Sequence, residues 1–144
     1  MSLSIKEIEI SDSRFITNLT IQLGYEATTQ ETEMRLNKIL LDNEHCAYAA
    51  IDEGKLIGWI HAFYVINLES KSFVEIGGMV VDEYYRGKGI GKKLIEKVEG
   101  WAIQKECNRL RVRSNVKRKN AHKFYNRRGF IETKEQKIFD KQIK

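Results

Sequence analysis

Apolar side chains in the first part of the chain follow the spacing of helices. In residues 15–23 and 34–41 the apolar positions recur every three or four residues, as on one face of an amphipathic helix. Gly24 follows the first run, in the manner of a glycine after a helix end. Residues 4–10 favour a short strand. The pattern therefore predicts one strand followed by two helices.

The next two segments have the composition of strands. Residues 46–51 and 56–66 are apolar and rich in branched and aromatic side chains, which suit the pleated surface of a sheet. The residues between them, Asp52-Glu53-Gly54-Lys55, are typical of a hairpin turn. The pattern predicts an antiparallel strand pair.

Strand and helix patterns alternate through the second half of the chain. Ile90, Leu94 and Val98 repeat at helical spacing, whereas Leu110 and Val112 alternate with arginines as in a strand. The patterns predict a strand, a long helix, a strand, a short helix and a closing strand, at residues 73–81, 90–104, 109–114, 121–129 and 136–139. The strands that flank the long helix should run parallel, because a helical crossover connects them. The order predicts an α/β fold with a mixed, mostly antiparallel sheet that ends in a parallel β-α-β crossover pair.

Length and composition narrow the class of protein. A chain of 144 residues, 42% hydrophobic and 31% charged, can bury a sizeable core, and no repeat or linker divides it. We expect a single domain over residues 1–144. No apolar run approaches the roughly 20 residues of a membrane span, and the first residues lack a signal-peptide pattern, so a cytoplasmic protein is expected. Cys46 and Cys107 lie far apart without metal-ligand spacing, so neither a disulfide nor a metal site is predicted.

The positive charge gathers near the C-terminus. The net charge is +5, and residues 109–128 contain nine Lys or Arg residues and no acidic residue. Such a region faces either an anion or bulk water. Nucleic acid is one candidate anion, but the chain has neither an aromatic stacking ladder nor a recognition-helix signature. A small anionic ligand is the better match.

The strongest chemical signal is a glycine-rich loop between the predicted strand 73–81 and the helix 90–104. Its sequence, Arg86-Gly87-Lys88-Gly89-Ile90-Gly91-Lys92, lets backbone N–H groups approach a ligand because glycine has no Cβ. The first N–H groups of a helix lack intrahelical partners and attract an anion. A phosphate or pyrophosphate is the expected ligand; a tight turn with solvated lysines is the alternative. The loop lacks the Gly-Lys-Ser/Thr ending of a P-loop, which argues against ATP hydrolysis.

Two motifs connect this loop to a known family. The run Met79-Val80-Val81-Asp82-Glu83-Tyr84-Tyr85-Arg86-Gly87-Lys88-Gly89-Ile90-Gly91-Lys92 resembles the acetyl-CoA motif Q/R-x-x-G-x-G/A of the GNAT N-acetyltransferase superfamily. Phe124-Tyr125-Asn126-Arg127-Arg128-Gly129-Phe130 resembles the family's later F-Y-x-x-x-G-F segment. The resemblance implies an acetyl-CoA-dependent acyltransferase that passes an acetyl group to a primary amine by direct attack in a ternary complex.

The resemblance also implies a binding mode for acetyl-CoA. The backbone of Met79, Val80 and Val81 would pair with the pantetheine arm as an added strand, in a slot left where the strand 109–114 splays away. The loop from Arg86 to Lys92 would bind the pyrophosphate. Family members often contact the cofactor through an asparagine seven residues before the tyrosine; that position holds Arg118 here, and Asn120 nearby is the candidate for the contact.

Glu75 is the candidate general base. An amine must lose a proton before it can attack, because an alkyl ammonium has a pKa near 10 in water. Glu75 is the only acid in the strand 73–81, and strict alternation would place it on the side of Gly77, Met79 and Val81. By resemblance it also occupies a position where some family members carry the base. A carboxylate paired with an arginine is the structural alternative, and water chains serve other members.

Tyr125 is the candidate proton donor to the departing thiolate, because a phenol is protonated at neutral pH. A packed core aromatic is its alternative. His61, which shares a strand face with Trp59 and Phe63, either lines the acceptor cleft or packs within the sheet. His122 is expected at the surface, with a contact to the basic phosphate region as its alternative.

Two other functions stay open from the sequence alone, namely a non-catalytic acyl-CoA sensor and a basic nucleic-acid-binding module. The enzyme is favoured, with a small-molecule or peptide amine as acceptor and neither nucleic acid nor membrane as partner. The sequence does not name the acceptor, and it leaves the oligomeric state open, a homodimer included.

Overall fold

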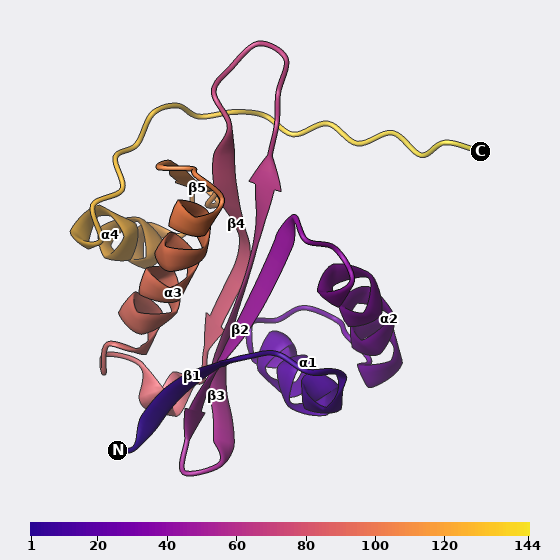
Figure 1. The fold of residues 1–144 in the computed structure, drawn as a ribbon, viewed down its shortest axis with the longest axis vertical. Coiled ribbons are helices and arrows are strands. Elements are labelled where there is room, and N and C mark those ends of the chain that lie inside the picture. The colour runs from indigo at the N-terminus through magenta and orange to yellow at the C-terminus, as the bar shows by residue number, and fades with distance from the viewer. The chain divides into compact units, whose positions relative to one another are not determined.

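A five-stranded mixed sheet is the frame of the first of two units into which the chain divides, residues 1–112 and 113–144. The computed structural model describes all residues 1–144. The strands lie side by side in chain order (Figure 1), as β1 (Leu3–Glu7), β2 (His45–Asp52), β3 (Lys55–Val65), β4 (Phe73–Val81) and β5 (Leu110–Val112). Neighbours are antiparallel except for β4 and β5, which are parallel. The predicted fold class is confirmed.

Helices cover both faces of this sheet. α1 (Ser13–Gln22) and α2 (Thr29–Leu40) lie on one face, and α3 (Ile90–Gln104), which connects β4 to β5, lies on the other (Figure 1). Short 3-10 turns, η1 (Ile10–Asp12) and η2 (Glu83–Tyr85), precede α1 and the glycine-rich loop. None of the helices combines the length and the apolar composition of a membrane-spanning segment.

The core has one layer on each face of the sheet, as the helical periodicity requires. Toward α1 and α2, buried residues pack in one cluster, namely Ile8, Ile16, Leu19, Leu36, Ala47, Ala49, Leu56 and Val80, with Trp59 against it. Toward α3, the helix buries Ile90, Leu94, Ile95, Val98 and Ala102. Both cysteines are buried and free, and they pack as small apolar residues.

A bulge interrupts the pairing of β3 with β4 and changes which side chains share a face. His61 pairs with Gly78 and Ala62 with Ile76, so Gly77 is an extra residue. A Cβ on Gly77 would lie 2.9 Å from Cε1 of Phe63, and a Cβ on Gly78 would lie 3.1 Å from the Trp59 ring. Both glycines therefore face the rings of β3, where no side chain would fit.

The second unit contains one helix, α4 (Lys119–Arg127), and residues 128–144 form neither helix nor strand. The short helix was predicted, but the closing strand over residues 136–139 was wrong. Its apolar side chains Ile138 and Phe139 are 80% and 86% exposed, and no strand pairs with the segment. Alternation alone does not make a strand when the backbone has no partner. The single domain over residues 1–144 stays a prediction.

Candidate active site

β4 has an open edge over its second half. It pairs with β5 only through Val74, Glu75 and Ile76, so from Gly77 onward its sole partner is β3. The N–H of Asp82 donates to the carbonyl of Ile57 at 2.8 Å, which directs the backbone of residues 82 and 80 toward β3. By alternation, the N–H and C=O groups of Met79 and Val81 face the open side. β5 ends at Val112, so the pairing of the two parallel strands stops there.

The glycine-rich loop continues from this edge to the start of α3. Gly87 and Gly89 have φ of 77° and 81°, and a Cβ on either would meet nothing within 4 Å. Glycine is thus required for the left-handed backbone rather than for lack of space. The first helical hydrogen bond is donated by Lys93 to the carbonyl of Gly89 at 3.1 Å. The N–H groups of residues 90–92 therefore remain directed out of the helix end, as an anion site needs.

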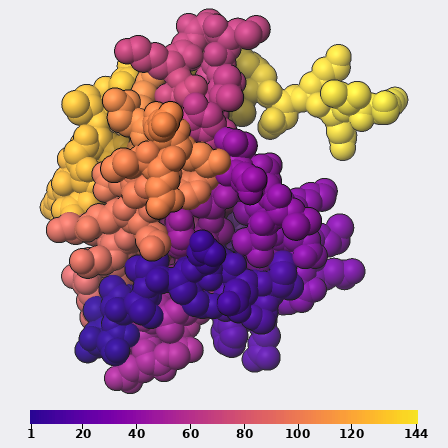
Figure 2. Space-filling view, in the orientation of Figure 1, coloured from indigo at the N-terminus to yellow at the C-terminus, as the bar shows by residue number.

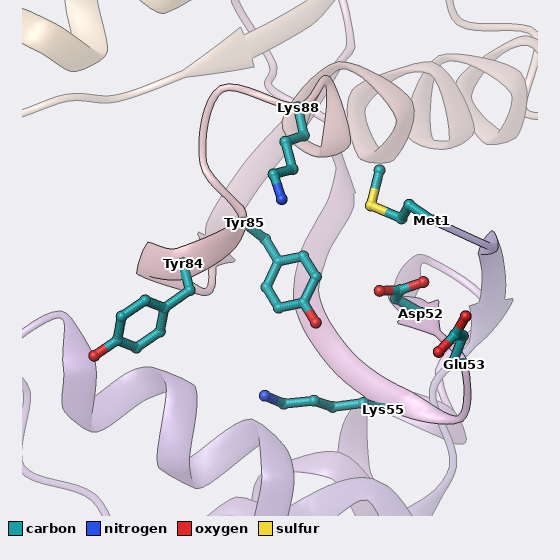
Figure 3. Close-up of a pocket in the computed structure, with 7 residues that line it drawn as sticks. All are labelled: Met1, Asp52, Glu53, Lys55, Tyr84, Tyr85 and Lys88. Atoms are coloured by element: carbon teal, nitrogen blue, oxygen red, sulfur yellow. The ribbon is translucent and has the colours of Figure 1, made fainter.

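A shallow pocket of about 510 Å³ lies beside the loop, where the hairpin turn of β2 and β3 approaches η2. In Figure 3 the ring of Tyr85 stands in this pocket between Lys55 and Lys88, whose Nζ atoms lie 5.7 and 5.3 Å from its centroid. Two carboxylates, Asp52 and Glu53, also line the pocket and offset the positive charge of the two lysines. Figure 2 shows the N-terminal residues at the surface next to this turn, and the N–H of Ser2 donates to Asp52 at 2.9 Å. Because its Nζ atom lies over the Tyr85 ring, Lys88 points into the pocket.

Glu75 lies one residue before the end of the parallel pairing, opposite Phe63 on β3 and Arg111 on β5. Because of the bulge, it faces the same side as Phe63, Gly77 and Gly78. The expectation that it shares a side with Met79 and Val81 was wrong, because the extra residue at Gly77 reverses the alternation. The candidate base therefore lies on the face toward α1 and α2.

A pair of histidines, only one of which the sequence singled out, lies on the same face. Nδ1 of His45 and Nε2 of His61 are 2.9 Å apart, and the rings stack with centroids 5.2 Å apart. Burial, and secondarily the nearby His45, lowers the pKa of His61 to about 4. Behind His45, the carboxylate of Asp42 lies 3.7 Å from Nε2. The missed histidine, His45, is the first residue of β2, and only the strand register, which places it opposite Phe63, could have indicated it.

Tyr125, in the second unit, packs edge-on between Phe124 and Phe130, with centroids 5.4 and 5.6 Å away. Burial raises the pKa of its phenol, and Arg118 acts in the opposite direction. The hydroxyl thus keeps its proton at neutral pH, as a proton donor must. Arg118 immediately precedes α4 and Asn120 is exposed in its first turn, so both cofactor-contact candidates belong to this unit.

Comparison with known proteins identifies the family. The model of the Acetyltransferase (GNAT) family matches residues 10–130, and the chain belongs to this family. N-acetylaspartate synthetase from Xenopus tropicalis is 35% identical over 85 residues, which are 59% of this chain and 30% of that protein. Aminoalkylphosphonate N-acetyltransferase from Salmonella typhimurium is 32% identical over 92 residues, which are 63% of this chain and 60% of that protein.

Solved structures show the same fold over the whole chain. The structure of AAC(6')-Iy in complex with a bisubstrate analogue, CoA-S-monomethyl-acetylneamine, superposes with a TM-score of 0.87 at 22% identity and covers 99% of this chain and 100% of that one. By contrast, this chain spans only 30% to 60% of the length of the two curated relatives above. The comparisons thus settle the family and the fold.

Proposed function

We propose that the chain is an N-acetyltransferase that transfers the acetyl group of acetyl-CoA to a primary amine by direct attack in a ternary complex. The open edge of β4, which leads without interruption to the free N–H groups at the start of α3, carries this proposal. An extended ligand with amides at one end and a pyrophosphate at the other matches this arrangement, and the pantetheine and pyrophosphate of coenzyme A have that form. Membership of the family supports the same activity.

The proposed binding mode follows the geometry of the first unit. The amides of the pantetheine arm would pair with the backbone of Met79 and Val81, and the pyrophosphate would lie on the loop from Arg86 to Lys92. The arm would then run along β4 toward the end of the parallel pairing. Its thioester would reach the bulge at Gly77 and Gly78, within the reach of Glu75, which faces the same side of the sheet as these glycines.

Two residues would act on the reacting atoms in this proposal. Glu75 would take a proton from the amine as the nitrogen bonds to the thioester carbon, and Tyr125 would give a proton to the sulfur as the C–S bond breaks. The acceptor would be a small-molecule amine, since similar proteins include the aminoalkylphosphonate N-acetyltransferase above and an aminoglycoside N(6')-acetyltransferase from Stenotrophomonas maltophilia, 26% identical over 118 residues. Asn120 would contact the cofactor.

Thiol release from acetyl-CoA, measured with a panel of amines, tests the proposal. The panel includes 2-aminoethylphosphonate, aspartate, neamine and a lysine peptide, and calorimetry with coenzyme A runs in parallel. We expect binding of coenzyme A and amine-dependent thiol release. Binding without release for every amine would indicate a sensor, and no binding at all would refute the proposed cofactor site.

A further inference from the structure

The face of the sheet beside the bulge carries a compact group of polar and aromatic side chains. His45, Phe63 and Glu75 lie opposite one another in register across β2, β3 and β4. His61, two residues before Phe63, stacks with the His45 ring and lies 5.6 Å from the ring of Phe63. Among the titratable groups here, His45 contacts His61 directly, Glu75 lies on the same face of the sheet opposite Phe63, and Asp42 lies behind His45.

The hydrogen bonds in this group decide which nitrogen of His61 carries its proton. A single proton occupies the 2.9 Å contact between Nδ1 of His45 and Nε2 of His61. The Asp42 carboxylate, 3.7 Å from Nε2 of His45, favours a proton on that nitrogen. A neutral His45 protonated there can only accept at Nδ1, so the shared proton belongs to Nε2 of His61. Nδ1 of His61 then keeps a free lone pair.

This lone pair lies at the bulge. A Cβ on Gly77 would be 3.0 Å from Nδ1 of His61, so this nitrogen lies close to the backbone of the bulge with no side chain between them. In the proposed binding mode the thioester ends at the same two glycines. An amine that attacks the thioester from the face toward α1 and α2 would therefore pass next to Nδ1.

We infer that Nδ1 of His61 accepts a hydrogen bond from the N–H of the acceptor amine that survives in the amide product, and thereby selects primary amines. The inference rests on the proposed function. A primary ammonium loses two of its three protons, the second as the N–C bond forms, and Glu75 passes both to water. The C–S bond breaks with its electron pair on sulfur, which takes a proton from Tyr125, and Tyr125 then regains a proton from water, so that one proton is released overall. The third proton stays on nitrogen and points to His61 throughout.

The chemistry of His61 suits such a role better than that of a base. With a pKa lowered to about 4 by burial and by His45, the ring is neutral at physiological pH and holds a transferred proton poorly. A hydrogen bond that persists from amine to amide needs no such transfer. A secondary amine has no N–H left after acylation, so it would leave Nδ1 without a partner in the product and in the late transition state.

Two substitutions at one position separate this role from packing. His61→Asn retains polar atoms near the position of Nδ1 but loses the contact with His45, whereas His61→Gln retains a group near Nε2 but nothing at Nδ1. The measurement is kcat/KM for the panel amine that the wild type acetylates best and for its N-methyl analogue, with calorimetry of coenzyme A binding for each variant. His122→Gln is the matched control, because Nε2 of His122 contacts the backbone carbonyl of Asn115 and no residue of this group.

We expect His61→Gln to lower kcat/KM for the primary amine about 10-fold to 100-fold, the loss expected when a buried polar group has no partner. The preference over the N-methyl analogue should shrink by a similar factor, and coenzyme A affinity should stay within about twofold. His61→Asn should retain more of the preference. A folded His61→Gln variant with the wild-type preference, or one that retains more of it than His61→Asn, would overturn the inference.

Nitrogen-15 NMR of the free protein tests the tautomer without any turnover. The chain has three histidines, so the His45→Gln and His122→Gln variants assign the signals. Neutral His61 should carry its proton on Nε2 between pH 6 and 8, and a proton on Nδ1 would refute the mechanism. If the wild type acetylates no amine, both the proposed function and this inference are wrong. If the wild type is active but substitution of His61 leaves the preference for the primary amine unchanged, the inference is wrong and the proposed function stands.

Discussion

The cofactor side of the proposed site consists of backbone groups, whereas the acceptor side consists of side chains. The cofactor side is one continuous stretch, residues 79–92, and offers backbone N–H and C=O groups from an open strand edge, a loop and a helix start. The acceptor side brings side chains together from β2, β3 and β4, far apart in sequence. A backbone site can be read from local sequence, whereas a side-chain site depends on register. The comparison predicts that the two sides fail separately when they are altered.

Glu75→Gln should give the largest effect, and only on the acceptor side. Loss of the proposed base should reduce kcat/KM for the amine by a factor within the ~10²–10⁴ range of general base catalysis. The acidic limb of the pH profile should disappear, because protonation of the carboxylate no longer switches off the reaction. Glu75→Asp, which keeps a carboxylate, should retain that limb. Calorimetry should find coenzyme A affinity unchanged in both variants, and a persistent acidic limb in Glu75→Gln would give the base role to another group.

Tyr125→Phe should lower kcat by about 10²-fold, the lower end of the range for general acid catalysis, because a thiol is already a fair leaving group. The KM for acetyl-CoA should change little, since the hydroxyl acts on charge that develops as the sulfur departs. Steady-state and single-turnover kinetics measure both. Phe124→Leu, next to it in the same helix, controls for lost packing. Full kcat in Tyr125→Phe, with chemistry rate-limiting, would reduce Tyr125 to a packing residue.

Gly89→Val should damage the cofactor side alone. A β-branched residue at φ of 81° costs about 1–2 kcal/mol of strain, which reshaping of the loop would relieve by turning its N–H groups away. Coenzyme A should bind about 10-fold more weakly or worse by calorimetry. Gly100→Val is the control, because Gly100 lies in α3 with open space and no positive φ. If a folded Gly89→Val variant binds coenzyme A with wild-type affinity, this loop is not the pyrophosphate site.

The smallest expected effect concerns the lysines and arginines around the cofactor. Exposed charge pairs contribute about 0.2–1 kcal/mol and are screened by salt, so coenzyme A affinity should fall only a few-fold as salt rises to about 0.5 M. Dephospho-coenzyme A should bind about twofold to fivefold more weakly at low salt if a basic residue holds the 3′-phosphate. Equal affinities at low salt would place this phosphate in solvent.

The sequence was a good guide wherever a pattern was local. Helical spacing predicted α1, α2 and α3, and residue types alone predicted the glycine loop between β4 and α3. The left-handed backbone of Gly87 and Gly89 was not predicted. The sequence pattern did not predict the bulge at Gly77, because two successive glycines are also found in strands without a bulge. The contact of His45 with His61 escaped because it depends on which residues of two strands face each other. The closing strand failed because alternation does not reveal whether a partner strand exists.

The bulge also determines which side chains of β4 face α3 and which face α1 and α2. Val74 and Ile76 lie opposite Tyr64 and Ala62 and belong to the layer under α3, while Glu75 belongs to the other face. If all residues of β4 paired regularly with β3 and formed no bulge, Gly77 would take up a position of its own in the pleat. With the segment after Gly77 held by Asp82, the segment before it would then have to turn over. The carboxylate of Glu75 would then enter a layer of aliphatic side chains, where burial of a charge is costly. One residue without a side chain therefore keeps an acid out of the core and at the proposed site of reaction.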